Sequence, residues 1–193
     1  MRIIRSADYR RMPWKNGGGE TVEIAVSPPG ATLDAFDWRI SMAKVAASGP
    51  FSLFPGIDRT LAVLDGAGIV LAIDGQRDVR LDRASAPHAF PADVACEGRL
   101  VDGGIEDLNV MSRRGALRHR LRRLTLAEPT ALAREGDTLA VVTRGAGLQI
   151  RADGAQAALA AGDTLVLDGA ADAAVEITPE GPAEVYAIDL WRL

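Results

Sequence analysis

The chain has 193 residues, of which 48% are hydrophobic, so it can form one large or two small folded domains and is not a disordered chain. Its formal net charge of -4 gives no general attraction to nucleic acids or anionic membranes. Cys96 is its single cysteine, which excludes an intrachain disulfide and any zinc site built on a cysteine pair.

The hydrophobic pattern has a period of two residues along most of the chain, which predicts strands. In chain order, we expect strands at 21–26, 38–45, 60–65, 68–73, 78–81, 94–101, 107–112, 139–143, 147–151, 164–168, 174–178 and 184–191. Glycine, proline and aspartate separate them, a spacing typical of an all-β sandwich or barrel. The helix content should be a few short helices, one of them at 128–135, because Pro129 suits a first helical position.

An internal repeat predicts two similar β units. The triplets Gly66-Ala67-Gly68 and Gly145-Ala146-Gly147 stand 79 residues apart, and each follows one apolar run and precedes another. We therefore expect an N-terminal repeat at 1–115 and a C-terminal repeat at 116–193, packed as one compact unit. The arginine-rich join at 114–123 is either a nucleic-acid patch or an amphipathic strand, and the acidic chain as a whole favours the strand.

Three segments carry candidate binding residues. The glycine triplet that follows Trp14, Lys15 and Asn16 can expose successive N–H groups as an anion-binding nest. In the second segment, Asp58 and Arg59 are neighbours in a strand and point to opposite faces, so one of them points inward. In the third, the alternate residues of 107–113 share one polar face.

Signals of catalysis or membrane insertion are weak. Histidine occurs only at positions 88 and 119, and the chain carries no nucleophile elbow, zinc-protease motif or dinucleotide fingerprint. Nowhere do about 18 consecutive apolar residues occur, and the N-terminus has no signal-peptide pattern. We therefore expect a cytoplasmic protein with no membrane partner, and a binding protein in preference to an enzyme.

Four motifs in the first 115 residues jointly resemble the HutD/Ves family. They are Pro-Trp-Lys-Asn-Gly-Gly-Gly-x-Thr at 13–21, Trp-Arg-x-Ser-x-Ala at 38–43, Gly-Pro-Phe-Ser-x-Phe-Pro-Gly-x-Asp-Arg at 49–59 and Asp-Leu-Asn-Val-Met-x-Arg-Arg at 107–114. The resemblance implies a two-repeat cupin-like (bicupin) β-barrel and a link to histidine utilisation, in which members are thought to bind a pathway metabolite. Ves members are associated instead with environmental stress.

The comparison with metal cupins argues against a metal cofactor. Those proteins place two histidines, one residue apart, and then a glutamate ahead of the glycine turn. Counting back from Gly66 puts Ser52, Phe54 and Arg59 at these positions. Because a guanidinium replaces the carboxylate and both imidazoles are missing, we expect no metal and no other cofactor. Arg59 would bind a carboxylate instead.

The leading hypothesis is a protein that binds a small carboxylate such as formylglutamate, formiminoglutamate or urocanate, and so moderates histidine utilisation. Its binding residues would be Trp14, Lys15, Asn16, Gly17, Arg39, Ser41, Phe51, Asp58, Arg59 and Asn109. One alternative is a metal-independent isomerase or hydrolase acting on a small amide or sugar, with Glu23 or His88 as the general base. Another is a regulatory module that binds protein or DNA through the arginine-rich join. A homodimer is a further expectation, since cupins often pair through strands.

Overall fold

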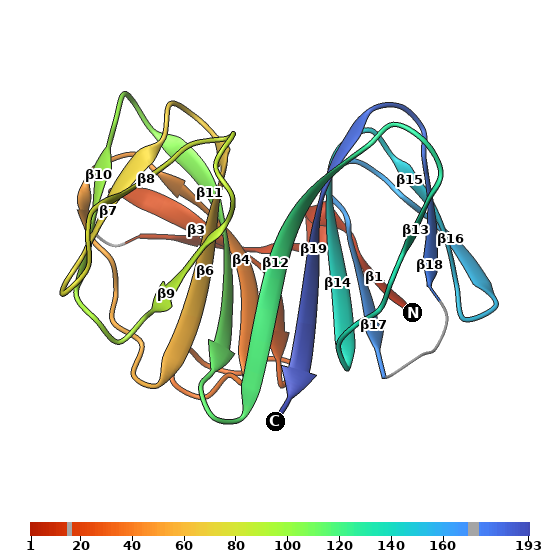
Figure 1. The fold of residues 1–193 in the computed structure, drawn as a ribbon, viewed down its shortest axis with the longest axis horizontal. Helices are drawn as coiled ribbons and strands as arrows, with labels where there is room; N and C mark the ends of the chain where they lie inside the picture. The colour runs from red at the N-terminus through yellow and green to blue at the C-terminus, as the bar shows by residue number, and fades with distance from the viewer. Residues whose placement is uncertain (15–16, 170–173) are drawn as a thin grey trace. The chain divides into compact units, whose positions relative to one another are not determined.

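The computed structural model describes residues 1–14, 17–169 and 174–193, and almost all of its regular structure is β-strand (Figure 1). The all-β fold class predicted from the sequence is confirmed. In the described residues the helical content is a single 3-10 turn, Ser6–Asp8 (η1). Within those same ranges, no helix is long and apolar enough to cross a membrane.

The chain divides into two compact units. One is Arg10–Arg118, and the other combines Met1–Tyr9 with His119–Leu193. The N-terminal residues belong to the second unit because β1 (Arg2–Ile4) pairs antiparallel with β17 (Thr164–Asp168). The sequence had predicted a first repeat at 1–115. The Arg10–Arg118 unit begins nine residues later than that repeat, and it ends at Arg118, within the strand β12.

The Arg10–Arg118 unit contains a six-stranded and a four-stranded sheet. Their orders are β2-β3-β4-β11-β6-β9 and β5-β10-β7-β8. The strands are β2 (Arg10–Pro13), β3 (Gly19–Ser27), β4 (Trp38–Val45), β5 (Gly49–Pro50), β6 (Ile57–Asp65), β7 (Ile69–Ile73), β8 (Val79–Leu81), β9 (His88–Pro91), β10 (Cys96–Leu100) and β11 (Ile105–Arg113). Leu61 and Val63 of the larger sheet share one hydrophobic cluster with Leu71 and Ile73 of the smaller, so the two sheets face each other.

The other unit has a five-stranded and a four-stranded sheet, in the orders β1-β17-β14-β19-β12 and β13-β18-β15-β16. The remaining strands are β12 (Leu117–Leu126), β13 (Thr130–Leu132), β14 (Thr138–Gly145), β15 (Leu148–Ala152), β16 (Ala155–Leu159), β18 (Val175–Pro179) and β19 (Ala183–Arg192). Leu139 and Val185 of one sheet pack in a cluster with Leu148 and Ile177 of the other.

The two Gly-Ala-Gly triplets occupy corresponding places in the two units. Gly66, with a φ of 93°, directly follows β6 and leads into β7, and Gly145, with a φ of 86°, is the last residue of β14 and leads into β15. In both units the turn carries the chain from the larger sheet to the smaller one. Positive φ values favour glycine, which explains Gly66, Gly68 and Gly145 in these turns.

Each of the twelve expected strands overlaps an observed strand, but the expected helix at 128–135 is wrong. This segment contains β13, in which Thr130 lies opposite Ile177 of β18 and Leu132 is buried. The hydrogen bonds of sheet pairing and the burial of Leu132 outweigh the weak preference of Pro129 for a helix start. The arginine-rich join is largely the strand β12, with Leu117 and Leu121 buried.

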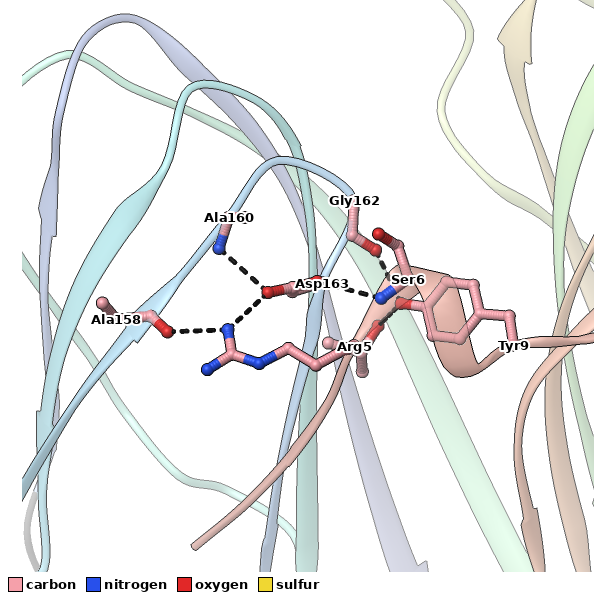
Figure 2. A network of polar contacts seen from close by, with 8 residues as sticks. Arg5, Ser6, Tyr9, Ala158, Ala160, Gly162 and Asp163 are labelled. Carbon is pink, nitrogen blue, oxygen red and sulfur yellow. Dashed lines mark hydrogen bonds and ion pairs between the residues drawn. The ribbon is translucent and has the colours of Figure 1, made fainter.

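A polar network fixes the N-terminal segment within its unit (Figure 2). The buried carboxylate of Asp163 accepts hydrogen bonds from Arg5 Nη1 at 2.6 Å, from the Ser6 amide at 2.9 Å and from the Ala160 amide at 3.0 Å. Burial by itself raises the pKa of Asp163, but these bonds together outweigh it and lower the pKa below the ordinary value. The Tyr9 hydroxyl donates to the Gly162 carbonyl at 2.6 Å.

Candidate functional site

A cavity of about 620 Å³ lies within the Arg10–Arg118 unit, and this volume is in the range of small-molecule sites. Polar side chains of the six-stranded sheet and apolar side chains of neighbouring segments line it. The lining residues are Met12, Pro13, Trp14, Thr21, Leu33, Arg39, Ser41, Ala43, Pro50, Phe51, Ser52, Phe54, Arg59, Asn109 and Met111.

The register of three central strands explains why the polar groups meet in this cavity. Arg39 on β4 and Arg59 on β6 both lie opposite Met111 of β11, in one row across the sheet. In the next row Ser41 lies opposite Asn109. Directly opposed residues point to the same face, and every second residue of a strand returns to that face. The sheet therefore presents two guanidinium groups, a hydroxyl and an amide on one surface.

Arg59 is almost fully buried, with 6% of its surface exposed, and it is held on several sides. Its Nε donates to Asn109 Oδ1 at 2.8 Å, and its Nη2 donates to the same oxygen. Its guanidinium lies 4.3 Å from the ring centre of Phe51 and 5.6 Å from that of Phe90, within cation–π range. Burial lowers the pKa of Arg59 to about 10, and the charge of Asp107 opposes this shift. The side chain remains a cation at neutral pH.

Arg39, the second cation of the site, forms a buried ion pair. Its Nε donates to Glu23 Oε2 at 2.7 Å, and both side chains are largely shielded from solvent. Glu23 is on β3, where it lies opposite Ser41 of β4, one row away from Arg39. The two cations of the site thus differ in their surroundings, because Arg39 has a carboxylate in contact and Arg59 contacts a neutral amide.

Aromatic side chains form the apolar wall of the cavity. Trp14 Nε1 donates to Thr21 Oγ1 at 2.8 Å, which fixes the indole against β3. Phe51 packs over Gly98 of β10, where an added Cβ would lie 2.9 Å from its ring. Because only glycine leaves this space, Gly98 lets Phe51 lie on the guanidinium of Arg59.

The structure brings together most of the described residues that the sequence had suggested for binding. Those lining the cavity are Trp14, Arg39, Ser41, Phe51, Arg59 and Asn109. Gly17 and Asp58 are not among the lining residues; Asp58 points to the other face of β6 and pairs with Arg114 at 2.8 Å. This follows from strand alternation, since Arg59 takes the inward position. Lys15 and Asn16 lie outside the described residues.

Sequence reasoning missed several lining residues and one buried carboxylate. Met12, Pro13 and Leu33 come from segments whose approach to the sheet depends on tertiary structure. Asp107 is fully buried beside Asn109, whose Nδ2 donates to its Oδ1. Strand alternation places Asp107 on the same predicted polar face as Asn109, but the sequence did not decide whether that face points to solvent or to a cavity.

The residues of the enzyme alternative have other surroundings. Glu23 Oε2 accepts a hydrogen bond from Arg39 Nε. His88, on β9, stacks on Phe90 with ring centres 6.1 Å apart, and burial lowers its pKa. His88 is not among the residues lining the cavity. The two candidate bases therefore do not converge on the cavity.

The arginine-rich join is engaged in ion pairs. Arg120 and Arg122 both donate to Oδ2 of the buried Asp189, at 2.9 and 2.8 Å. Arg120 also pairs with Glu135 at 2.7 Å. These contacts match the amphipathic strand that we favoured for this segment.

The donor set of the cavity suits an anion better than a metal ion. Ser52, Phe54 and Arg59, at the positions where metal cupins hold their ligands, all line the cavity. Among the described residues, no group of three or more His, Cys, Asp or Glu side chains could hold a metal ion. A guanidinium and an amide N–H attract negative charge.

Comparison with known protein families agrees with the sequence motifs. The family model described as HutD matches residues 6–186, which is nearly the whole chain. The chain belongs to the HutD family. Among curated relatives, an uncharacterised 21.2 kDa protein in the hutC 3' region of Pseudomonas putida is 42% identical over 111 residues, covering 58% of this chain and 57% of that protein. Protein Ves of Citrobacter koseri is 40% identical over 119 residues, covering 60% of this chain and 61% of that protein.

Solved structures extend the HutD likeness to the full length. A conserved protein of unknown function from Pseudomonas aeruginosa PAO1 superposes with a TM-score of 0.90 at 37% identity, over 98% of this chain and 97% of that one. HutD from Pseudomonas fluorescens SBW25, in a structure described as a formate condition, superposes with a TM-score of 0.81 at 33% identity. The match covers 100% of this chain and 98% of that one. Oxalate decarboxylase from Lactobacillus farciminis superposes with a TM-score of 0.67 at 10% identity. At this identity the likeness shows a shared cupin-type fold and no shared activity.

Proposed function

We propose that this HutD-family protein binds a small organic carboxylate in the cavity of its Arg10–Arg118 unit. The observation that carries the proposal is the pair of buried guanidinium groups, Arg39 and Arg59, on one face of the six-stranded sheet and at the same cavity. A buried guanidinium offers charge-assisted hydrogen bonds to a carboxylate, and these are stronger in a site shielded from water.

The shape of the site indicates a ligand larger than formate. A volume of about 620 Å³ has room for a metabolite of several carbon atoms. Trp14 and Phe51 supply apolar and aromatic contact surface, whereas Ser41 and Asn109 supply polar contacts for an amide or a second oxygen. Formylglutamate, formiminoglutamate and urocanate combine a carboxylate with a planar polar group, and each matches this combination.

The biological role that we propose is moderation of histidine utilisation by binding one of these pathway metabolites. Two comparisons support it: the family model that matches the chain is described as HutD, and the Pseudomonas putida relative is encoded beside hutC. Formate, named in the description of the Pseudomonas fluorescens HutD structure, is a minimal carboxylate probe for the same cavity.

Isothermal titration calorimetry with formate and each of the three metabolites tests the proposal. We expect a metabolite to bind more tightly than formate, and Arg59→Ala to abolish binding of both. Arg114→Ala is the matched control, because Arg114 is an arginine of the same unit that pairs with Asp58 and Asp93 and is not among the cavity-lining residues. Absence of binding to the unmodified protein, or equal loss in both variants, would refute the proposal.

A further inference from the structure

Asp107 is a buried carboxylate that the proposed function leaves unexplained. It lies opposite Ala43 of β4 and Val63 of β6, in the row next to Asn109, and none of its surface is exposed. Its Oδ1 accepts a hydrogen bond from Asn109 Nδ2. Within the described part of the chain its Oδ2 is buried without a hydrogen-bond partner. A hydrogen bond with the backbone of Ala43 also lowers the pKa of Asp107, but burial outweighs it. A buried carboxylate oxygen without a donor destabilises the charged form.

Asp107 controls which way the amide of Asn109 points. Asn109 Oδ1 accepts two N–H groups from Arg59, and its Nδ2 donates to Asp107. If the amide were reversed, its NH₂ group would meet the guanidinium and its oxygen would meet the carboxylate, both of which are repulsive. Asp107 therefore orients Asn109, and Asn109 in turn holds Arg59 at the cavity.

Asp107 is also the counter-charge of Arg59, separated from it by a neutral amide. The charges that act on Asp107 are Arg59 from β6 and Glu106 from its own strand. On β4, Arg39 is neutralised by Glu23 of β3, and from β10 the thiol of Cys96 lies near Arg59. When an anion binds Arg59, the negative charge of the anion and that of Asp107 repel each other, because only Arg59 and the amide of Asn109 lie between them. A proton on Asp107 removes this repulsion.

We propose that Asp107 is a positioning residue of the anion site and that its carboxyl takes up a proton when an anion binds at Arg59. This inference rests on the proposed function, because it concerns the same cavity. Such uptake is accessible near neutral pH, since burial raises the pKa of Asp107 to about 6 against the opposing charge of Arg59. Linkage then requires anion affinity to increase as the pH falls.

Calorimetric titration of the full-length protein with sodium formate at several pH values from 5 to 8 tests the uptake directly. Formate stays ionised over most of this range, so the probe itself contributes little to the pH dependence. We expect the affinity to rise as the pH falls, by about tenfold for each unit by which the bound anion raises the pKa of Asp107. Repeating each titration in buffers of different ionisation enthalpy should show net proton uptake between pH 6 and 7.

Two substitutions separate positioning from charge. Asp107→Asn removes the charge but keeps an oxygen that can accept from Asn109, so it should bind formate at every pH with the affinity of the unmodified protein at low pH, and without proton uptake. Asp107→Ala removes the acceptor too and should weaken binding at every pH. Glu106→Gln, on the same strand, is the control. It should keep the proton uptake and move it to slightly lower pH, because the negative charge of Glu106 raises the pKa of Asp107.

The outcomes distinguish this inference from the function on which it rests. Formate binding with constant affinity and no proton uptake would overturn the role of Asp107 and leave carboxylate binding intact. No binding of formate or of any of the three metabolites at any pH would overturn the proposed function itself. If Asp107→Asn does not fold, the proton uptake of the unmodified protein alone decides the question.

Discussion

Substituting Asp107 by asparagine should stabilise the folded protein at neutral pH, which is unusual for a fully buried polar residue. Burial raises the pKa of Asp107 from 3.8 to about 6, even though Arg59 opposes the shift. At about 1.4 kcal/mol per pKa unit, the ionised carboxylate lowers the free energy of unfolding by up to about 3 kcal/mol. This figure already includes the attraction to Arg59, so losing that attraction in the variant is not an additional cost.

The sign of the pH dependence follows from proton binding. Between pH 3.8 and about 6 the folded protein holds more protons on Asp107 than the unfolded chain, so this residue lowers stability as the pH rises through that window. The penalty is complete above about pH 7. Asp107→Asn removes it, so the variant should gain about 1–3 kcal/mol over the unmodified protein at pH 8 and little at pH 4.

Urea unfolding followed by tryptophan fluorescence measures this difference, because Trp14 and Trp38 both lie in the Arg10–Arg118 unit. Taking the difference between the two proteins at each pH cancels the titration of all other groups. Asp163→Asn is the contrasting variant: the pKa of Asp163 is lowered, so its loss should destabilise more at neutral than at acid pH. If Asp107→Asn were instead more destabilising at pH 8 than at pH 4, attraction to Arg59 would outweigh burial, and the reasoning would be wrong.

Three further substitutions test other parts of the structure. Glu23→Gln leaves the buried Arg39 without its carboxylate, so it should cost about 3 kcal/mol in urea unfolding and tighten formate binding in calorimetry; unchanged affinity would show that Arg39 does not face the ligand. Tyr9→Phe removes a hydroxyl bonded to Gly162, so it should cost about 1–3 kcal/mol in urea unfolding while leaving formate affinity unchanged. Gly98→Ala places a methyl group 2.9 Å from Phe51, so it should weaken formate binding, and a crystal structure with Phe51 unmoved would contradict this explanation.

The strand pattern was predictable because period-two alternation is local. Arg39 and Ser41 fell on one face of an expected strand, and the structure places both at the cavity. The pattern could not decide between Asp58 and Arg59, because neighbouring residues always point to opposite faces and either choice keeps the alternation. The register settles it: Arg59 lies opposite Met111, which lines the cavity.

The network around Arg59 could not be predicted, since it joins residues distant in sequence. The hydrogen bonds from Arg59 to Asn109 span 50 positions, and they exist because β6 and β11 are neighbours in the sheet. Glu23 balances the buried Arg39, whereas Asp58 pairs with Arg114. Asp107, which balances Arg59, acts through an intermediate amide, and sequence spacing contains no signal for such an indirect contact.

The interiors of the two units differ in how their polar groups are arranged. On the inner face of β11, alternate residues are Asp107, Asn109 and Met111. On β19, Val185 and Ala187 pack into the core, and the next alternate residue, the buried Asp189, pairs with Arg120 and Arg122. Both units have the same Gly-Ala-Gly crossover between a larger and a smaller sheet, so the crossover alone does not determine where polar side chains point. Aliphatic side chains can interdigitate and fill the space between two sheets. Buried charged groups must instead be hydrogen-bonded or paired. Asp189 is paired by two arginines of its own unit, whereas Arg39 and Arg59 line the cavity, where a bound carboxylate would add to the contacts they already make.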